Sequence, residues 1–140
     1  MLIAASLFAF SACEKEDDPV TPNTPDTPGQ EDQSFEELIV GQWTVTASQE
    51  SFQYSEGASW SDATDAVVGE TFVFNADKTG WMYFEEEGSF TWTCNGSNID
   101  IIEANELHMT GTITKTDNNH ITLNNLEKPR YKATISLKRK

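Results

Sequence analysis

From Phe35 to the end of the chain, apolar and polar residues alternate in short segments separated by turn-forming residues. A period of two places successive side chains on opposite faces of a strand, so this pattern predicts β-strands with one buried face. Turn signals recur about every ten residues, which is typical of an all-β sandwich or barrel. The pattern predicts eight strands in an antiparallel meander, at residues 42–48, 69–75, 79–86, 88–94, 98–103, 106–116, 120–126 and 130–139. The stretch 35–40 is expected to form one helical turn before the first strand.

Two hairpins can be given a register from this alternation. Asn-Gly at 95–96 is a strong signal for a two-residue turn, and it predicts that Trp92 pairs with Ile99. A three-residue loop over 117–119 would keep the apolar rows of its two strands on one face. The last strand repeats the design, with inward-facing residues expected at Tyr131, Ala133, Ile135 and Leu137.

The N-terminal part of the chain has a different composition. The apolar run 2–12 is too short for a permanent transmembrane helix, which needs about 20 residues, but it suits the core of a secretion signal. No Lys or Arg precedes this run, so we expect the natural chain to begin a few residues earlier. Residues 18–34 are mostly Pro, Thr, Asp, Gln and Gly, which predicts a flexible tether without a core.

Charge and motif content exclude several classes of function. The formal net charge is −14, and only the end of the chain is basic, so nucleic acid is not an expected partner. The sequence has no nucleophile-elbow, phosphate-loop, metal-spaced cysteine or His-Glu-x-x-His motif, so we expect no enzyme activity, cofactor or metal. His108 and His120 would lie about 26 Å apart along the strands and could not share a metal. Cys94 is expected to be a buried free thiol.

The residues before Cys13, Phe-Ser-Ala at 10–12, resemble the lipobox of bacterial lipoproteins. The resemblance implies that a signal peptide of residues 1–12 is removed, that Cys13 is lipidated, and that the protein meets a membrane through its lipid anchor. The following residues, Glu-Lys-Glu-Asp-Asp at 14–18, look like the signal that sends some Gram-negative lipoproteins to the cell surface. The alternatives are retention on the periplasmic side of the outer membrane, or a buried N-terminal element with an incidental thiol.

The folded part, residues 35–140, resembles the lipocalin-like domains of bacterial lipoproteins. The similarity rests on Gly-Gln-Trp at 41–43, on the hairpin 72–80 and on Phe-Thr-Trp at 90–92. It implies an eight-stranded up-and-down antiparallel barrel that follows a tether of residues 13–34. It also implies that Gly41 and Trp43 close one end, with Arg139 of the last strand against the Trp43 ring; a frayed, solvated C-terminus is the alternative.

The long segment 49–69 between the first two predicted strands would form a lid over the open mouth in such a barrel. The resemblance implies lid residues Phe52, Tyr54 and Trp60 over a cavity for a small hydrophobic or amphipathic ligand. The candidate lining residues are Phe72, Phe74, Phe90, Trp92 and Met109. The alternative is a solid barrel whose aromatic rings fill the interior, with outward aromatics such as Trp60, Tyr54 or Trp81 contacting a glycan or a partner protein. The sequence leaves the oligomeric state open.

Overall fold

The structure is a computed structural model that describes residues 33–84 and 86–140. The signal segment, Cys13 and the tether up to residue 32 lie outside the described residues. Within the described part, the elements in chain order are α1 (Phe35–Ile39), β1 (Gly41–Phe52), β2 (Ser61–Thr64), β3 (Thr71–Phe74), β4 (Thr79–Phe84), β5 (Glu86–Asn95), β6 (Asn98–Glu103), β7 (His108–Asp117), β8 (His120–Lys128) and β9 (Tyr131–Arg139).

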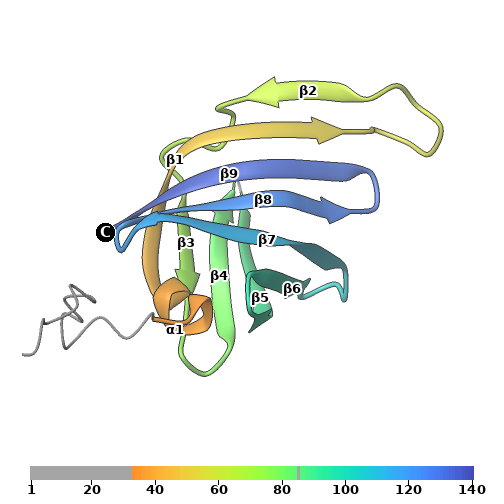
Figure 1. Cartoon of the computed structure of the whole chain (residues 1–140). Coiled ribbons are helices and arrows are strands. Elements are labelled where there is room, and N and C mark those ends of the chain that lie inside the picture. Colours follow the sequence, from red (N-terminus) through yellow and green to blue (C-terminus); the bar gives the residue numbers. More distant parts are fainter. Residues whose placement is uncertain (1–32, 85) are drawn as a thin grey trace, which may run out of the picture. The chain divides into compact units, whose positions relative to one another are not determined.

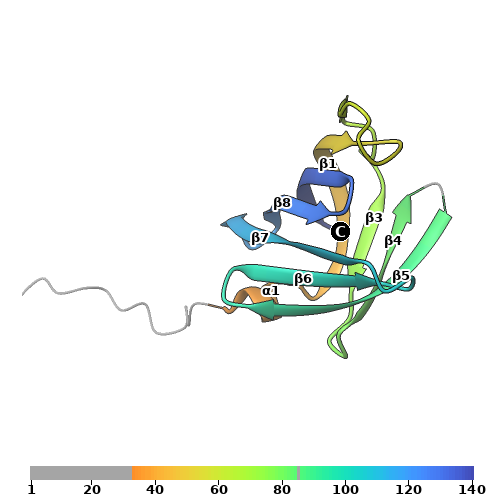
Figure 2. The same ribbon diagram turned by 90° about the vertical axis from the view of Figure 1, so that its right-hand side faces the viewer.

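Eight of the strands form a closed antiparallel barrel, as the sequence predicts. Strands β3 to β9 follow one another as a meander, and β1 closes the barrel by pairing with both β3 and β9. The turned view in Figure 2 shows this sheet curling round from β3 through β6 and back to β1. Closure leaves β1 and β9 without a free edge along their shared seam.

The remaining strand, β2, was not predicted. It pairs with the last four residues of β1 and extends the sheet beside the barrel at the top of Figure 1. Its sequence, Ser-Asp-Ala-Thr, has no row of large apolar residues and none of its residues is fully buried. A strand without a buried face leaves no alternating pattern in the sequence.

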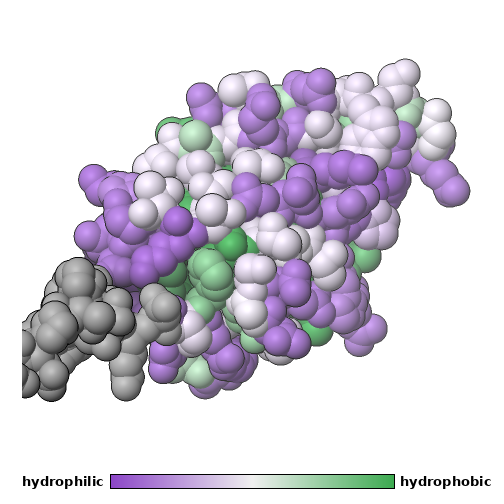
Figure 3. Space-filling view, in the orientation of Figure 1, coloured by the Kyte–Doolittle hydropathy of each residue, from purple (hydrophilic) through white to green (hydrophobic). Residues whose placement is uncertain are grey.

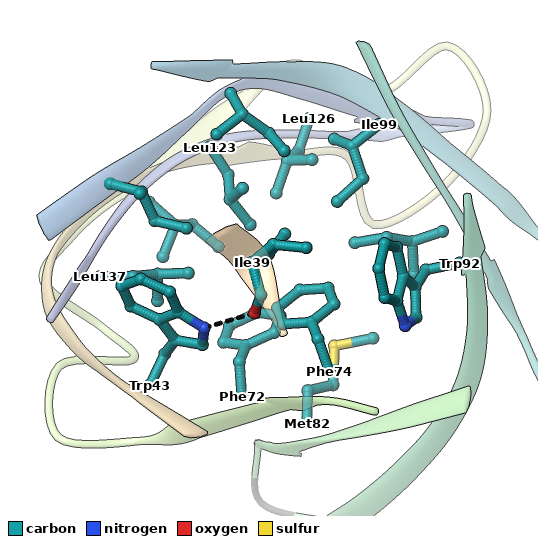
Figure 4. Packing of buried hydrophobic residues seen from close by; sticks show 14 of the residues in the cluster. Ile39, Trp43, Phe72, Phe74, Met82, Trp92, Ile99, Leu123, Leu126 and Leu137 are labelled. Carbon is teal, nitrogen blue, oxygen red and sulfur yellow. Dashed lines mark hydrogen bonds between the residues drawn. The ribbon is translucent and has the colours of Figure 1, made fainter. Parts of the chain in front are cut away.

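The helix α1 lies at one end of the barrel, where the sequence predicts a helical turn. Ser34 and Glu37 form a capping box that satisfies backbone N–H groups at its start. Leu38 and Ile39 are 1% and 0% exposed and pack into the barrel core. Figure 4 shows Ile39 among the core side chains, with its carbonyl oxygen accepting a 2.7 Å hydrogen bond from Trp43 Nε1. Within the described residues, no helix has the length and hydropathy that crossing a bilayer requires.

The half of the barrel next to α1 is solid. The Phe74 ring meets the rings of Phe90 and Trp92 edge-on, at centroid distances of 5.3 Å and 5.7 Å. Gly80 makes room for this cluster, because a Cβ there would lie 2.4 Å from the Phe90 ring and from the Val73 carbonyl oxygen. Tight aromatic packing of this kind buries a large apolar area at the density usual for protein interiors.

The hairpin between β5 and β6 corrects one predicted register. Trp92 pairs with Ile101 rather than Ile99, because the turn residues are Gly96 and Ser97 instead of 95–96. Gly96 has a φ of +58° at the first central position, which is the conformation that glycine supplies most cheaply. The displacement is two residues, an even number, so the apolar row still faces the core.

The hairpin between β7 and β8 confirms the predicted pairing away from its turn. Ile113 lies opposite Leu123, as a loop over 117–119 requires. The loop itself has two residues, because Asp117 pairs with His120 and a register shift after Lys115 absorbs the extra residue. Both apolar rows therefore face inward, as expected.

Two bulges change which residues face the interior. In β1, the register shifts between Val45 and Ala47, so Ser48 and Glu50 turn inward after Trp43 and Val45. In β8, a shift between Leu123 and Leu126 has the same effect on Lys128. An extra residue in one strand of an antiparallel pair reverses the alternation beyond it. Polar side chains thus enter the half of the barrel that lies away from α1.

The outward positions of the strands are mainly polar. Figure 3 shows one face of the molecule, where hydrophilic residues predominate and hydrophobic atoms gather in a small area near the centre. Among the residues whose burial is described, the large exposed apolar side chains are those of Tyr54, Trp60, Val68, Tyr83 and Leu107. Strands β3 and β4 also carry apolar residues on their outer face, where Val73 is 6% exposed and pairs with Trp81.

Candidate functional site

A cavity of about 710 Å³ lies in the end of the barrel opposite α1. This volume is within the range of about 300 to 1,000 Å³ that is usual for small-molecule sites. Most strands of the barrel contribute to its wall, together with the segments that join β2 to β3 and β6 to β7. The lining residues that shape it are Glu50, Val67, Glu70, Phe72, Met82, Glu103, Met109, Lys128, Tyr131 and Ile135.

The floor of the cavity is apolar. Phe72, Met82, Met109 and Ile135 are each at most 5% exposed and come from four different strands. Val67, from the segment between β2 and β3, packs against the same core and adds to the wall. Methionine side chains adapt their shape readily, so this floor can accept apolar groups of varied outline.

The rim of the cavity holds a hydrogen-bonded group around Glu50. The carboxylate of Glu50 accepts a 3.1 Å hydrogen bond from the Tyr131 hydroxyl and another of 3.1 Å from Ser48 Oγ. Ser48 is 3% exposed, so its hydroxyl needs an internal partner. The β1 bulge therefore places a carboxylate inside the barrel mouth, where Ser48 of β1 and Tyr131 of β9 donate to it and fix its position.

A second polar pair lies across the rim. Lys128 Nζ is 2.5 Å from Glu103 Oε1, and their side chains are only 22% and 16% exposed. The same ammonium group lies 5.3 Å from the centroid of the Tyr131 ring. Burial favours such pairing, because an isolated charge at this depth would lose hydration without compensation.

Tyr131 joins these two groups. Burial raises the pKa of its phenol well above the usual range, and the negative charge of Glu50, the hydrogen bond to Glu50 and the charge of Glu103 raise this pKa further. Each of these causes opposes a further negative charge in the cavity mouth. The phenol consequently stays protonated and acts as a hydrogen-bond donor at neutral pH.

The raised pKa of Tyr131 predicts a loss of stability in alkali. Below the unfolded-state pKa of about 10 the stabilisation is fully present, and it is lost as pH rises through that value toward the higher folded-state pKa. The loss is up to about 1.4 kcal/mol for each pH unit. Urea unfolding should show the free energy of unfolding falling more steeply between pH 10 and 11 for the wild-type protein than for Tyr131→Phe. Parallel curves for the two proteins would contradict this expectation.

The structure separates the predicted site residues into three groups. Phe72 and Met109 line the cavity. Phe74, Phe90 and Trp92 are 1% to 3% exposed and lie in the solid half of the core. The three lid candidates, Phe52, Tyr54 and Trp60, are not among the described residues that line the cavity.

The lid candidates lie elsewhere because β1 and β2 carry them away from the mouth. Phe52 is the last residue of β1 and contacts the Tyr54 ring edge-on, at 5.1 Å between centroids. Tyr54 is 79% exposed and Trp60 is 44% exposed. The part of the lid segment that does reach the cavity is its end, with Ala66, Val67 and Glu70.

The polar residues of the rim were missed by sequence reasoning for different reasons. Glu103 follows Ile99 and Ile101 in alternation, so its inward position could have been found. Glu50 and Lys128 are out of phase with the apolar rows that precede them, and only the two bulges turn them inward. The sequence shows no clear signal for either bulge apart from the paired asparagines 124–125, of which Asn125 has a φ of +49°.

The residues expected to close the opposite end do meet. Trp43 pairs with Arg139 across the seam, and Arg139 Cζ lies 4.4 Å from the Trp43 ring centroid. Gly41 has a φ of +135°, and a Cβ there would be 2.7 Å from Arg139 Nη1. The guanidinium also donates to the carbonyl oxygens of Leu38 and Val40 at 2.5 Å and 2.9 Å. These contacts close this end of the barrel.

Comparison with known proteins adds little to this geometry. No known family model and no curated protein matches the chain. Among solved structures, a redesigned β-barrel is similar, with 15% sequence identity and a TM-score of 0.43, over 75% of this chain and 94% of that protein. Any assignment of function therefore depends on the cavity itself.

Proposed function

We propose that the protein is a lipid-anchored, lipocalin-like lipoprotein of the bacterial envelope whose barrel binds a small hydrophobic or amphipathic ligand. The cavity carries the binding part of this proposal, because an apolar floor beneath a few convergent polar groups is the usual form of a small-molecule site. Its floor and its rim provide those two components. The lipobox-like residues before Cys13 support the anchor.

The proposal places the protein in the outer membrane, exposed at the cell surface or else facing the periplasm. Two or three acyl chains on one cysteine are sufficient for stable attachment, since each buried methylene contributes about 0.8 kcal/mol. Detergent phase partitioning of the protein made in a Gram-negative host tests this part. The wild-type protein should enter the detergent phase and Cys13→Ser should remain in the aqueous phase; an aqueous wild-type protein would contradict the anchor.

Decanol is a suitable neutral probe for the cavity, with binding measured by isothermal titration calorimetry. Ala104 lies on the exposed loop at the cavity mouth, so Ala104→Trp should obstruct access without disturbing the core and weaken decanol binding at least about tenfold. Ala76 lies in the exposed hairpin between β3 and β4, next to the closed end. Ala76→Trp is the matched control and should leave binding unchanged.

The alternative function, contact of a glycan or protein through outward aromatics, predicts a different pattern. Trp60 lies on the surface with Lys132 Nζ 5.5 Å from its ring centroid. If binding were lost in Trp60→Ala and kept in Ala104→Trp, the surface would be the site and the cavity proposal would be wrong. Equal decanol affinity of the wild-type protein and Ala104→Trp would equally contradict the cavity as the site.

A further inference from the structure

The charges around the cavity mouth are unbalanced. Among the described side chains that line the cavity, those of Glu50, Glu70 and Glu103 carry carboxylates and that of Lys128 carries an ammonium group. The formal net charge of this lining is therefore −2. Clefts with low-dielectric walls concentrate such a potential and select ligands of the opposite sign.

The ammonium group of Lys128 is already engaged within the wall. It lies 2.5 Å from Glu103 Oε1, so an anionic headgroup would have to displace Glu103 before it could pair with Lys128. The displaced carboxylate would then lie unpaired in a poorly hydrated site, which is energetically costly. An anionic amphiphile is consequently disfavoured, although the cavity contains a lysine.

The carboxylate of Glu50 keeps its formal charge uncompensated. Its two partners, Ser48 and Tyr131, are neutral hydroxyl donors that orient the carboxylate without cancelling its charge. Glu70 also lines the cavity, and none of the ion pairs among the described residues involves its side chain. Both carboxylates belong to the cavity wall, so each would attract a cation bound in the cavity.

The raised pKa of Tyr131 reflects the same excess of negative charge in the cavity mouth. Burial is the main reason why the pKa of its phenol is raised, and the negative charges of Glu50 and Glu103 add to the effect. A positive charge brought to the same place would be favoured by the same two carboxylates. Its alkyl part would lie on Phe72, Met82, Met109 and Ile135.

We propose that the ligand of this cavity is a cationic amphiphile, with an ammonium group attracted by the carboxylates of Glu50 and Glu70 and an apolar tail on the floor. This inference rests on the proposed binding function and specifies its ligand class. Three probes with the same ten-carbon tail, decyltrimethylammonium, decanol and decanoate, distinguish whether the cavity binds a ligand from which ligand charge it prefers. The two ionic probes are used below their micelle-forming concentrations and decanol below its solubility limit, with the full chain, and binding is measured by calorimetry.

Decyltrimethylammonium should bind at least about tenfold more tightly than decanol, and decanoate should bind most weakly. The preference for the cation should shrink toward unity in about 1 M salt, because the charges at the mouth are partly solvated. Glu50→Gln keeps the size of the side chain and should reduce the preference for the cation over decanol by about threefold or more. Glu70→Gln should also reduce the preference for the cation.

Glu56→Gln is the matched control, since Glu56 is exposed and lies outside the cavity wall. It should change none of the three affinities. Thermal unfolding of each variant establishes that it is folded before its affinities are compared. If Glu50→Gln is unfolded, Glu70→Gln and the wild-type probe series decide the question.

Decanoate binding as tightly as decyltrimethylammonium, with decanol also bound, would overturn the inference and leave the binding function intact. An unchanged cation preference in both carboxylate variants would likewise overturn it. Failure of all three probes to bind would instead overturn the proposed function itself.

Discussion

Replacing Trp43 with alanine is expected to lower the free energy of unfolding by about 3 to 5 kcal/mol. The Trp43 side chain is 0% exposed, and its Nε1 donates to the Ile39 carbonyl oxygen at 2.7 Å. Removing the indole leaves a cavity at the closed end and an unsatisfied carbonyl on α1. Small domains are stable by only about 5 to 15 kcal/mol, so this variant would be close to unfolding at moderate temperature.

Chemical denaturation of Trp43→Ala beside Trp60→Ala provides the measurement. Both variants lose an indole, but Trp60 is 44% exposed, so its replacement should cost less than about 1 kcal/mol. Trp43→Phe keeps an aromatic ring and loses the donor, and it should have an intermediate cost. Equal destabilisation by Trp43→Ala and Trp60→Ala would show that Trp43 is not the buried centre of the closed end.

The second large effect is expected for Arg139→Met, at about 2 to 3 kcal/mol. The Arg139 guanidinium donates to the carbonyl oxygens of Leu38, Val40 and Asn118 at 2.5 Å, 2.9 Å and 3.2 Å. It also lies over the Trp43 ring, an arrangement worth about 0.5 to 2 kcal/mol. Methionine keeps much of the apolar stem but satisfies none of these carbonyls.

Lys138→Met is the control on the same strand, because Lys138 is exposed. It should change the free energy of unfolding by no more than about 0.5 kcal/mol. Arg139→Lys should fall between the two, since one ammonium group cannot reach all the carbonyls that the planar guanidinium contacts. If Arg139→Met were as stable as Lys138→Met, the C-terminus would be frayed and the end of the barrel would not depend on it.

Alternation of apolar residues predicted most of the fold, because the barrel core imposes a period of two on each strand. Ala133, Ile135 and Leu137 are inward and at most 4% exposed, as the pattern requires. The contact of Arg139 with Trp43 was also predictable, since it follows from the lipocalin resemblance and from the parity of the last strand. Alternation does not fix the position of a turn, because either of two overlapping residue pairs can form its centre. In the hairpin at Gly96 the central pair is 96–97 rather than 95–96.

The candidate site was less accessible to sequence reasoning. Large aromatic residues suggested a cavity wall, but Phe74, Phe90 and Trp92 fill the solid half, where burial of their rings contributes most. The rim depends on bulges that reverse the alternation before Glu50 and Lys128, and a bulge leaves little trace in one sequence. The exposed positions of Tyr54 and Trp60 depend on β2, whose residues carry no periodic signal.

The core and the cavity both depend on closure of the barrel between β1 and β9, which pair from Trp43 with Arg139 to Phe52 with Tyr131. Amide hydrogen exchange followed by NMR tests this seam directly, because edge strands open locally far more often than strands that are paired on both sides. The seam amides of β1 and β9 are expected to exchange as slowly as those between β4 and β5. Exchange about a hundredfold faster along the facing edges of β1 and β9 would show an open sheet and contradict the closed barrel.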